Sequence, residues 1–130
     1  MNARSQLLEL YFRWKRLSET EGTAILAANW SEVSRCQNDK AALQYGIITA
    51  HELLQKELSK CEGDPRMNDP QIRSIVIELI LLEQRNGQWL DEQKEKAQQE
   101  NRALTKTTKN LRAVHKAYAS ARSEVWHSYS

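Results

Sequence analysis

The chain has 130 residues, of which 28% are charged and 40% are hydrophobic, and its formal net charge is +2. This composition is typical of one folded domain with a modest core, and it excludes collagen-like and disordered chains. The longest apolar run, IVIELILL, contains Glu78 and is far shorter than the roughly 20 residues of a membrane span. The N-terminus lacks a secretory signal pattern. We therefore expect a single cytoplasmic domain, residues 1–130.

The sequence predicts two helices before residue 62. Apolar residues at steps of three and four predict a first helix over about residues 5–28. Asn29, followed three places on by Glu32, is typical of an N-cap, so a second helix is expected over about residues 30–61. The alternative is one continuous helix over about residues 5–60, because no glycine or proline enforces a break at Asn29.

A third and longer helix is predicted over about residues 70–126. Both prolines fall in the stretch CEGDPRMNDP, and Pro70 under the cap Asp69 is a favourable first residue of a helix. Two series of every seventh residue then follow, which is the pattern of a coiled-coil seam. They are Ile72, Leu79, Asn86, Gln93, Glu100, Thr107, Val114 and Ala121, and Val76, Glu83, Leu90, Ala97, Leu104, Leu111, Tyr118 and Val125. The fold class is thus all-α: an antiparallel helical coiled-coil bundle of about three helices with a long C-terminal helix.

The last part of this helix, ALTKTTKNLRAVHKAYASARSEVW, is amphipathic and strongly basic. Six cations lie from Arg102 to Arg122 with no acidic residue between Glu100 and Glu124, whereas the rest of the chain has 13 basic and 17 acidic residues. The three helices would measure roughly 36, 45 and 85 Å, so the first two cover the third only to about Asn101. The uncovered apolar side is our predicted partner-binding site, which comprises Leu104, Leu111, Val114, Tyr118, Val125 and Trp126.

The energetics of this tail predict that it needs a partner. Burial of those six side chains would gain on the order of 10 kcal/mol, whereas fixing 24 backbones costs on the order of 24 kcal/mol. We therefore expect the tail to be frayed when alone and ordered as a helix against a partner. Three other functions of this tail remain open. It could form the seam of a homodimeric structural coiled coil, bind nucleic acid through its cations, or attach to a membrane surface.

Catalytic chemistry is not indicated. The three histidines, His51, His115 and His127, have no Cys or His at the spacings of a metal site, and Gly-rich phosphate-binding loops are absent from the sequence. Carboxylates alternate with lysines in DEQKEK, as on a solvated helix surface. We expect no enzymatic activity, no cofactor, no metal and no small-molecule substrate.

Two stretches resemble a known family. LLEQRNGQWLDEQKEKAQQENRAL, residues 81–104, resembles the long helix of FlgN-type flagellar export chaperones, in which Asn-Gly is followed by large apolar residues, Gln and a polar helical run. LSETEGTAILAANWSEVSRCQNDKAAL, residues 17–43, is similar to the first corner of that family, including the lysine and leucine at Lys40 and Leu43. The related FliT-type chaperones are the second candidate family.

The resemblance implies a cytoplasmic chaperone for type III protein export that uses no nucleotide. Such a chaperone binds hook-associated proteins of the hook-filament junction and prevents their premature assembly. It receives their C-terminal helix on the last part of its own last helix. A component of the export gate is a further implied partner, although Tyr118 is followed here by Ala119 and not by the glycine that family members often carry.

Overall fold

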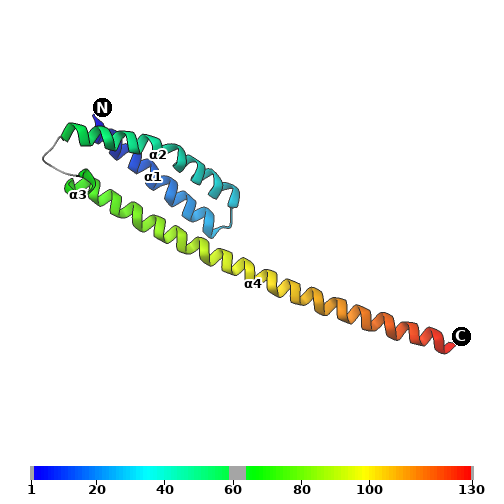
Figure 1. Cartoon of the computed structure of the whole chain (residues 1–130). Helices are drawn as coiled ribbons and strands as arrows, with labels where there is room; N and C mark the ends of the chain where they lie inside the picture. Colours follow the sequence, from blue (N-terminus) through cyan, green and yellow to red (C-terminus); the bar gives the residue numbers. More distant parts are fainter. Residues whose placement is uncertain (1, 59–63, 130) are drawn as a thin grey trace. The chain divides into compact units, whose positions relative to one another are not determined.

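The computed structural model describes residues 2–58 and 64–129, with the side chains of residue 67 and residues 122–129 outside the description. The described chain is all-helical, with α1 over Ala3–Leu26, α2 over Trp30–Leu58, α3 over Pro65–Asn68 and α4 over Pro70–Tyr129 (Figure 1). This confirms the predicted all-α class with a long last helix. The short helix α3 was not predicted. Contacts divide the chain into an N-terminal unit, Met1–Gln93, and a C-terminal unit, Lys94–Ser130.

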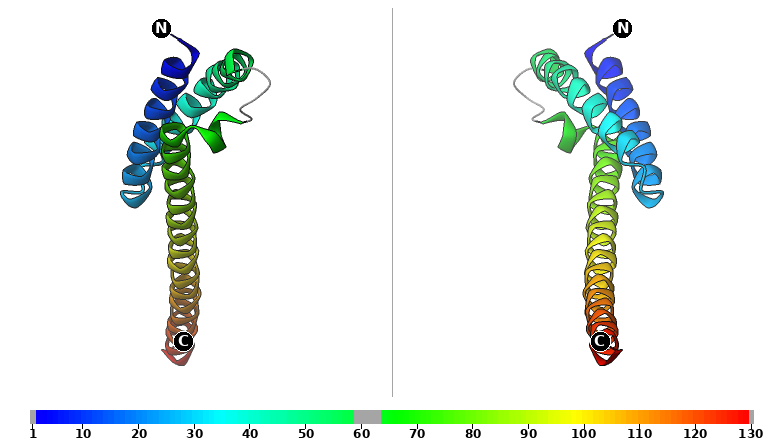
Figure 2. Two further views of the ribbon diagram at one scale, coloured as in Figure 1. Left: turned by 90° about the vertical axis from the view of Figure 1, so that its left-hand side faces the viewer. Right: turned by 90° about the vertical axis from the view of Figure 1, so that its right-hand side faces the viewer.

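In the N-terminal unit, α1 and α2 pack beside the first part of α4. The corner between α1 and α2 makes them antiparallel, and the two further views in Figure 2 show that they cross at an angle. Arg4 contacts Asp69 near the start of α4, and Leu26 accepts a hydrogen bond from Gln93 further along it. The first part of α4 therefore runs parallel to α1 and antiparallel to α2.

A Schellman motif ends α1 and produces the break that the sequence left open. The amide of Ala28 donates to the carbonyl of Ile25 at 3.0 Å, and the amide of Asn29 donates to the carbonyl of Ala24 at 2.8 Å. Ala28 has φ 54°, in the left-handed region that usually takes glycine. The Asn29 side chain then accepts from the amide of Glu32 at 3.3 Å. The predicted cap at Asn29 is confirmed.

We expect replacement of Ala28 by glycine to raise the free energy of unfolding by about 0.5–1 kcal/mol, because glycine has no Cβ to strain at positive φ. Urea unfolding followed by circular dichroism would measure this. Ala27, with φ −84°, is the matched control, and its replacement by glycine should lower stability. If Ala28→Gly were less stable than the wild type, the explanation by backbone strain at Ala28 would be contradicted.

Asp69 fixes the start of α4 and ties it to α1. Its carboxylate accepts hydrogen bonds from the amides of Gln71 and Ile72, so it is the N-cap that the sequence predicted. The same carboxylate accepts from Arg4 Nε at 2.7 Å. The hydrogen bond from Arg4 lowers the pKa of Asp69 below its ordinary value. One side chain therefore caps α4 and joins it to the first turn of α1.

Two apolar clusters form the core of the N-terminal unit. The larger one comprises Ala3, Leu7, Leu8, Tyr11, Ala50, Leu54, Ile72, Ile75 and Leu79. The smaller one, Ala24, Ile25 and Val33, packs against Trp89 and Leu90. Between these clusters each of the three long helices also places polar side chains in the interior, among them Ser18 of α1, Lys40 of α2 and Asn86 of α4.

The C-terminal unit is helical, as the sequence predicted for the last part of the third helix. α4 continues as an α-helix to Tyr129. Because this part of the chain extends a helix that already exists, no new helix nucleus is needed and each added residue contributes a hydrogen bond. Within the described residues, no helix has an apolar stretch long enough to cross a membrane.

Candidate partner-binding site

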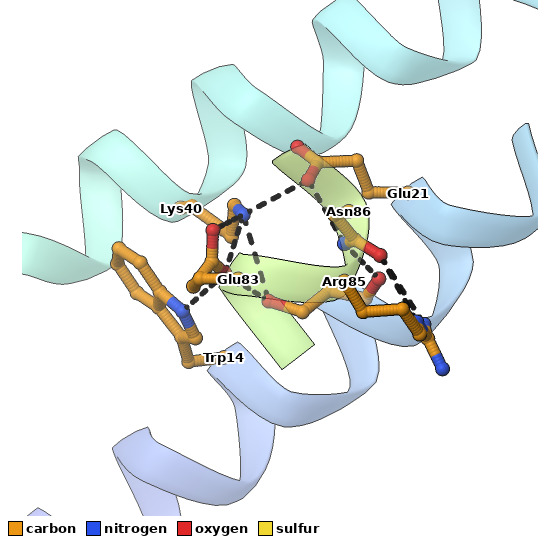
Figure 3. A network of polar contacts seen from close by, with 7 residues as sticks. Trp14, Glu21, Lys40, Glu83, Arg85 and Asn86 are labelled. Carbon is orange, nitrogen blue, oxygen red and sulfur yellow. Dashed lines mark hydrogen bonds and ion pairs between the residues drawn. The ribbon is translucent and has the colours of Figure 1, made fainter. Parts of the chain in front are cut away.

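A buried lysine lies at the centre of the N-terminal unit. Lys40 of α2 donates from Nζ to Glu83 Oε1 at 2.8 Å, to Glu83 Oε2 at 3.1 Å and to Glu21 Oε1 at 3.2 Å (Figure 3). Its side chain is 8% exposed, that of Glu21 is 5% exposed and that of Glu83 is 40% exposed. Lys40 therefore joins a carboxylate of α1 to a carboxylate of α4. We call Trp14, Ser18, Glu21, Lys40, Glu83 and Asn86 the Lys40 cluster.

The remaining members of the cluster donate hydrogen bonds to Glu83 and to the backbone of α1. Trp14 Nε1 and Ser18 Oγ both donate to Glu83 Oε1, at 3.0 and 2.6 Å, and the Trp14 ring lies 5.2 Å from Lys40 Nζ. Asn86 Nδ2 donates to the carbonyl of Ser18 at 2.7 Å. Burial would raise the pKa of Glu83, but the hydrogen bonds from Lys40, Ser18 and Trp14 outweigh it and leave this pKa below its ordinary value. The charged groups of the cluster pair with one another, Lys40 with Glu21 and with Glu83. We therefore assign the cluster a structural role.

The close packing of α1 on α4 at this level depends on Gly22. A Cβ at Gly22 would lie 2.7 Å from Asn86 Oδ1 and 2.6 Å from an Arg85 guanidinium nitrogen. We expect Gly22→Ala to lower the free energy of unfolding by about 1 kcal/mol, because overpacking outweighs the gain in helix propensity. Gly87→Ala, with no atom within 4 Å of the added Cβ, should raise it by a similar amount. Urea unfolding of both variants tests the pair, and a gain in stability from both would contradict the close contact.

The Lys40 cluster was not predicted, although the sequence contains a signal for it. Lys40 follows Val33 and Cys36 on the apolar side of the second helix, and Glu83 and Asn86 each interrupt an apolar heptad series. The sequence had indicated Lys40 only as a point of resemblance to a family, and Asn86 as a member of a heptad series. Polar residues at core spacing on three neighbouring helices predict a buried network, since each must find a partner when buried.

Four of the six predicted partner-binding residues form an exposed apolar stripe on the C-terminal unit. Leu104, Leu111, Val114 and Tyr118 are 65%, 64%, 67% and 69% exposed. On a helix they lie within about 80° of one another around the axis, so they make one continuous side. We call these four residues the apolar stripe. The other two predicted residues, Val125 and Trp126, have side chains outside the described residues.

The opposite side of the same helix carries unpaired cations. Arg102, Lys106, Lys109, Arg112 and Lys116 are all exposed, and none of them forms an ion pair with any part of the chain that the structure describes. In the N-terminal unit, by contrast, several exposed cations have local acidic partners, as Arg35 has in Glu32 and Asp39. The C-terminal unit is therefore apolar on one side and cationic on the other.

A second apolar surface lies in the N-terminal unit, where side chains of α1, α2 and α4 line a common hollow. It is a groove of about 500 Å³, and its apolar lining includes Tyr11, Trp14, Ile47, Ile48, Val76 and Ile80. Ile48 and Ile80 are about half exposed, at 47% and 51%. Its charged rim residues, Arg66 and Glu83, already have partners in Asp64 and Lys40.

The described residues contain no group of three or more His, Cys, Asp or Glu side chains placed to hold a metal ion. The chain offers another molecule the apolar stripe, the exposed cations opposite it, and the groove between α2 and α4. Comparison of the chain with models of known protein families, with curated proteins and with solved structures gave no match.

Proposed function

We propose that this protein is a non-catalytic binding protein that takes up an amphipathic helix of a partner on the apolar stripe. The observation that carries the proposal is the exposure of four large apolar side chains, 64–69%, along one side of a helix. A continuous apolar row with this spacing is the surface that helix-on-helix recognition uses. A contiguous exposed apolar patch is also a feature of interaction sites more than of isolated soluble surfaces.

The free energy gained by burying the apolar stripe and the free energy lost on association are of the right size for reversible binding. Burial gains roughly 1.5–3 kcal/mol for each large apolar side chain, and association costs about 4 kcal/mol or more in lost freedom. A partner must therefore cover most of the stripe at once to bind. This requirement favours a helix with its own apolar row over a short loop.

We further propose that the chain acts as a cytoplasmic export chaperone of the FlgN type, and that its partner is a secreted flagellar hook-associated protein. The resemblance of residues 17–43 and 81–104 to that family supports this finer proposal, as does the exposed stripe on the last helix. In this role the chain would cover the partner's terminal helix and prevent assembly before type III export. A component of the export gate is the second proposed partner.

A pull-down from a lysate of the source cells tests both levels of the proposal. The baits are the full chain and a chain that ends at Asn101, and retained proteins are identified by mass spectrometry. A hook-associated protein retained by the full chain alone is the expected result. Equal retention by both baits would move the binding surface to the groove of the N-terminal unit, and recovery of nucleic acid in place of protein would contradict a protein partner.

A further inference from the structure

The cations of the C-terminal unit are not equally far from the apolar stripe. At 100° per residue, Arg102, Lys109 and Lys116 lie about 160–200° from its centre, on the back of the helix. Lys106 and Arg112 lie about 120° from the centre, one on each side. Within residues 102–118, these two cations are therefore the charges nearest to a helix that packs on the stripe.

The rows between the stripe and these two cations contain no lysine, arginine or carboxylate. Ala103, Asn110 and Ala117 lie on the side of Lys106, and Thr108 and His115 lie on the side of Arg112. A long side chain on a helix covers the turn before its own Cα. Lys106 can therefore extend over Ala103, three residues before it, and Arg112 over Thr108, four residues before it, which brings both cations within reach of the rows that border the stripe.

We infer that the helix bound on the apolar stripe carries acidic residues in the rows that flank its own apolar face, where they pair with Lys106 and Arg112. This inference rests on the proposed function and specifies its partner. The described residues supply neither cation with a carboxylate, and the chain has no acidic residue between Glu100 and Glu124. Opposite charges beside an apolar seam select the partner and its orientation.

Two synthetic peptides test the inference with the full chain. Each has leucine in one apolar heptad row and the same uncharged residues elsewhere, but one has glutamate in both flanking rows and the other has lysine. Like charges in these rows keep each peptide from pairing with itself. Because two attractive contacts replace two repulsive ones, we expect the Glu peptide to bind about tenfold more tightly at low salt, with a smaller difference at high salt.

A matched pair of double variants shows which cations produce the preference for the Glu peptide. Lys106→Glu with Arg112→Glu should weaken binding of the Glu peptide about tenfold and strengthen binding of the Lys peptide. Lys109→Glu with Lys116→Glu changes the net charge by the same amount on the back of the helix, and its effect on either peptide should stay within about threefold. Equal effects of the two double variants would overturn the inference, because the cations would then act as an undirected polycationic surface.

The peptides also separate this inference from the proposed function. Equal affinity for the Glu and Lys peptides would overturn the acidic flanks and leave helix binding on the stripe intact. Failure of both peptides to bind would overturn the inference and would contradict the stripe as a binding surface.

Discussion

Replacement of Lys40 by methionine is expected to lower the free energy of unfolding by about 3–5 kcal/mol, the usual effect of removing one partner from a buried ion pair. Methionine fills a similar volume but supplies no charge and no donor. Glu21, whose side chain is 5% exposed, would then keep only its hydrogen bond from Asn86. Its Oε2 atom already has no hydrogen-bond partner in the protein. The loss arises from a carboxylate left buried without its cation.

Chemical unfolding of two further variants shows whether that explanation is right. Lys15 lies in an exposed pair with Glu78, at 3.2 Å, and Lys15→Met should change stability by about 1 kcal/mol or less. In the Lys40→Met background, Glu21→Leu removes the stranded carboxylate and should restore most of the loss. A loss from Lys40→Met as small as that from Lys15→Met would contradict a stabilising role for the cluster.

Leu111→Asp is expected to weaken partner binding at least about a hundredfold, because it removes a central apolar contact and forces a carboxylate toward the partner. Leu111 is 64% exposed, so the change removes little packing within the chain. The free energy of unfolding should therefore move by less than about 0.5 kcal/mol. Titration with the retained partner measures affinity, and far-ultraviolet circular dichroism measures helix content.

Ala113→Asp is the matched control for this change. Ala113 is exposed and lies on the opposite side of the helix, two residues from Leu111, so the variant adds the same charge to the same turn. Its affinity should stay within a few fold of wild type. Tyr118→Asp should behave like Leu111→Asp because it lies on the stripe one heptad later. Unchanged affinity in both stripe variants would exclude the stripe as the binding surface.

The sequence predicted the helices well because their signals are local. Periodic apolar residues, the Asn29 cap and the Asp69 cap each depend on neighbours within a few positions, and all three signals match the structure. The exit from α1 was harder to predict because Ala28 adopts a conformation that usually indicates glycine. Helix α3 was missed because one turn between two prolines leaves no periodicity to detect.

The two candidate sites also differ in whether their signal is local in the sequence. The apolar stripe could be predicted because it needs only the spacing of residues along one helix. The Lys40 cluster could not be assembled from spacing alone, because Glu21, Lys40 and Glu83 come from three helices and their pairing depends on how those helices pack. A polar residue in an apolar series indicates that a partner exists, but the series does not identify it.

The Lys40 cluster has a consequence for the register of the bundle. α4 has an apolar pattern that repeats every seven residues, so packing alone would tolerate a shift of α4 by one heptad along α1 and α2. Such a shift would bring Val76 or Leu90 to the place of Glu83, and Leu79 or Gln93 to the place of Asn86. Lys40 would then lose its carboxylate partner on α4 in either direction while remaining buried. The lysine therefore sets the longitudinal alignment of the three helices, which a uniform apolar seam would leave ambiguous.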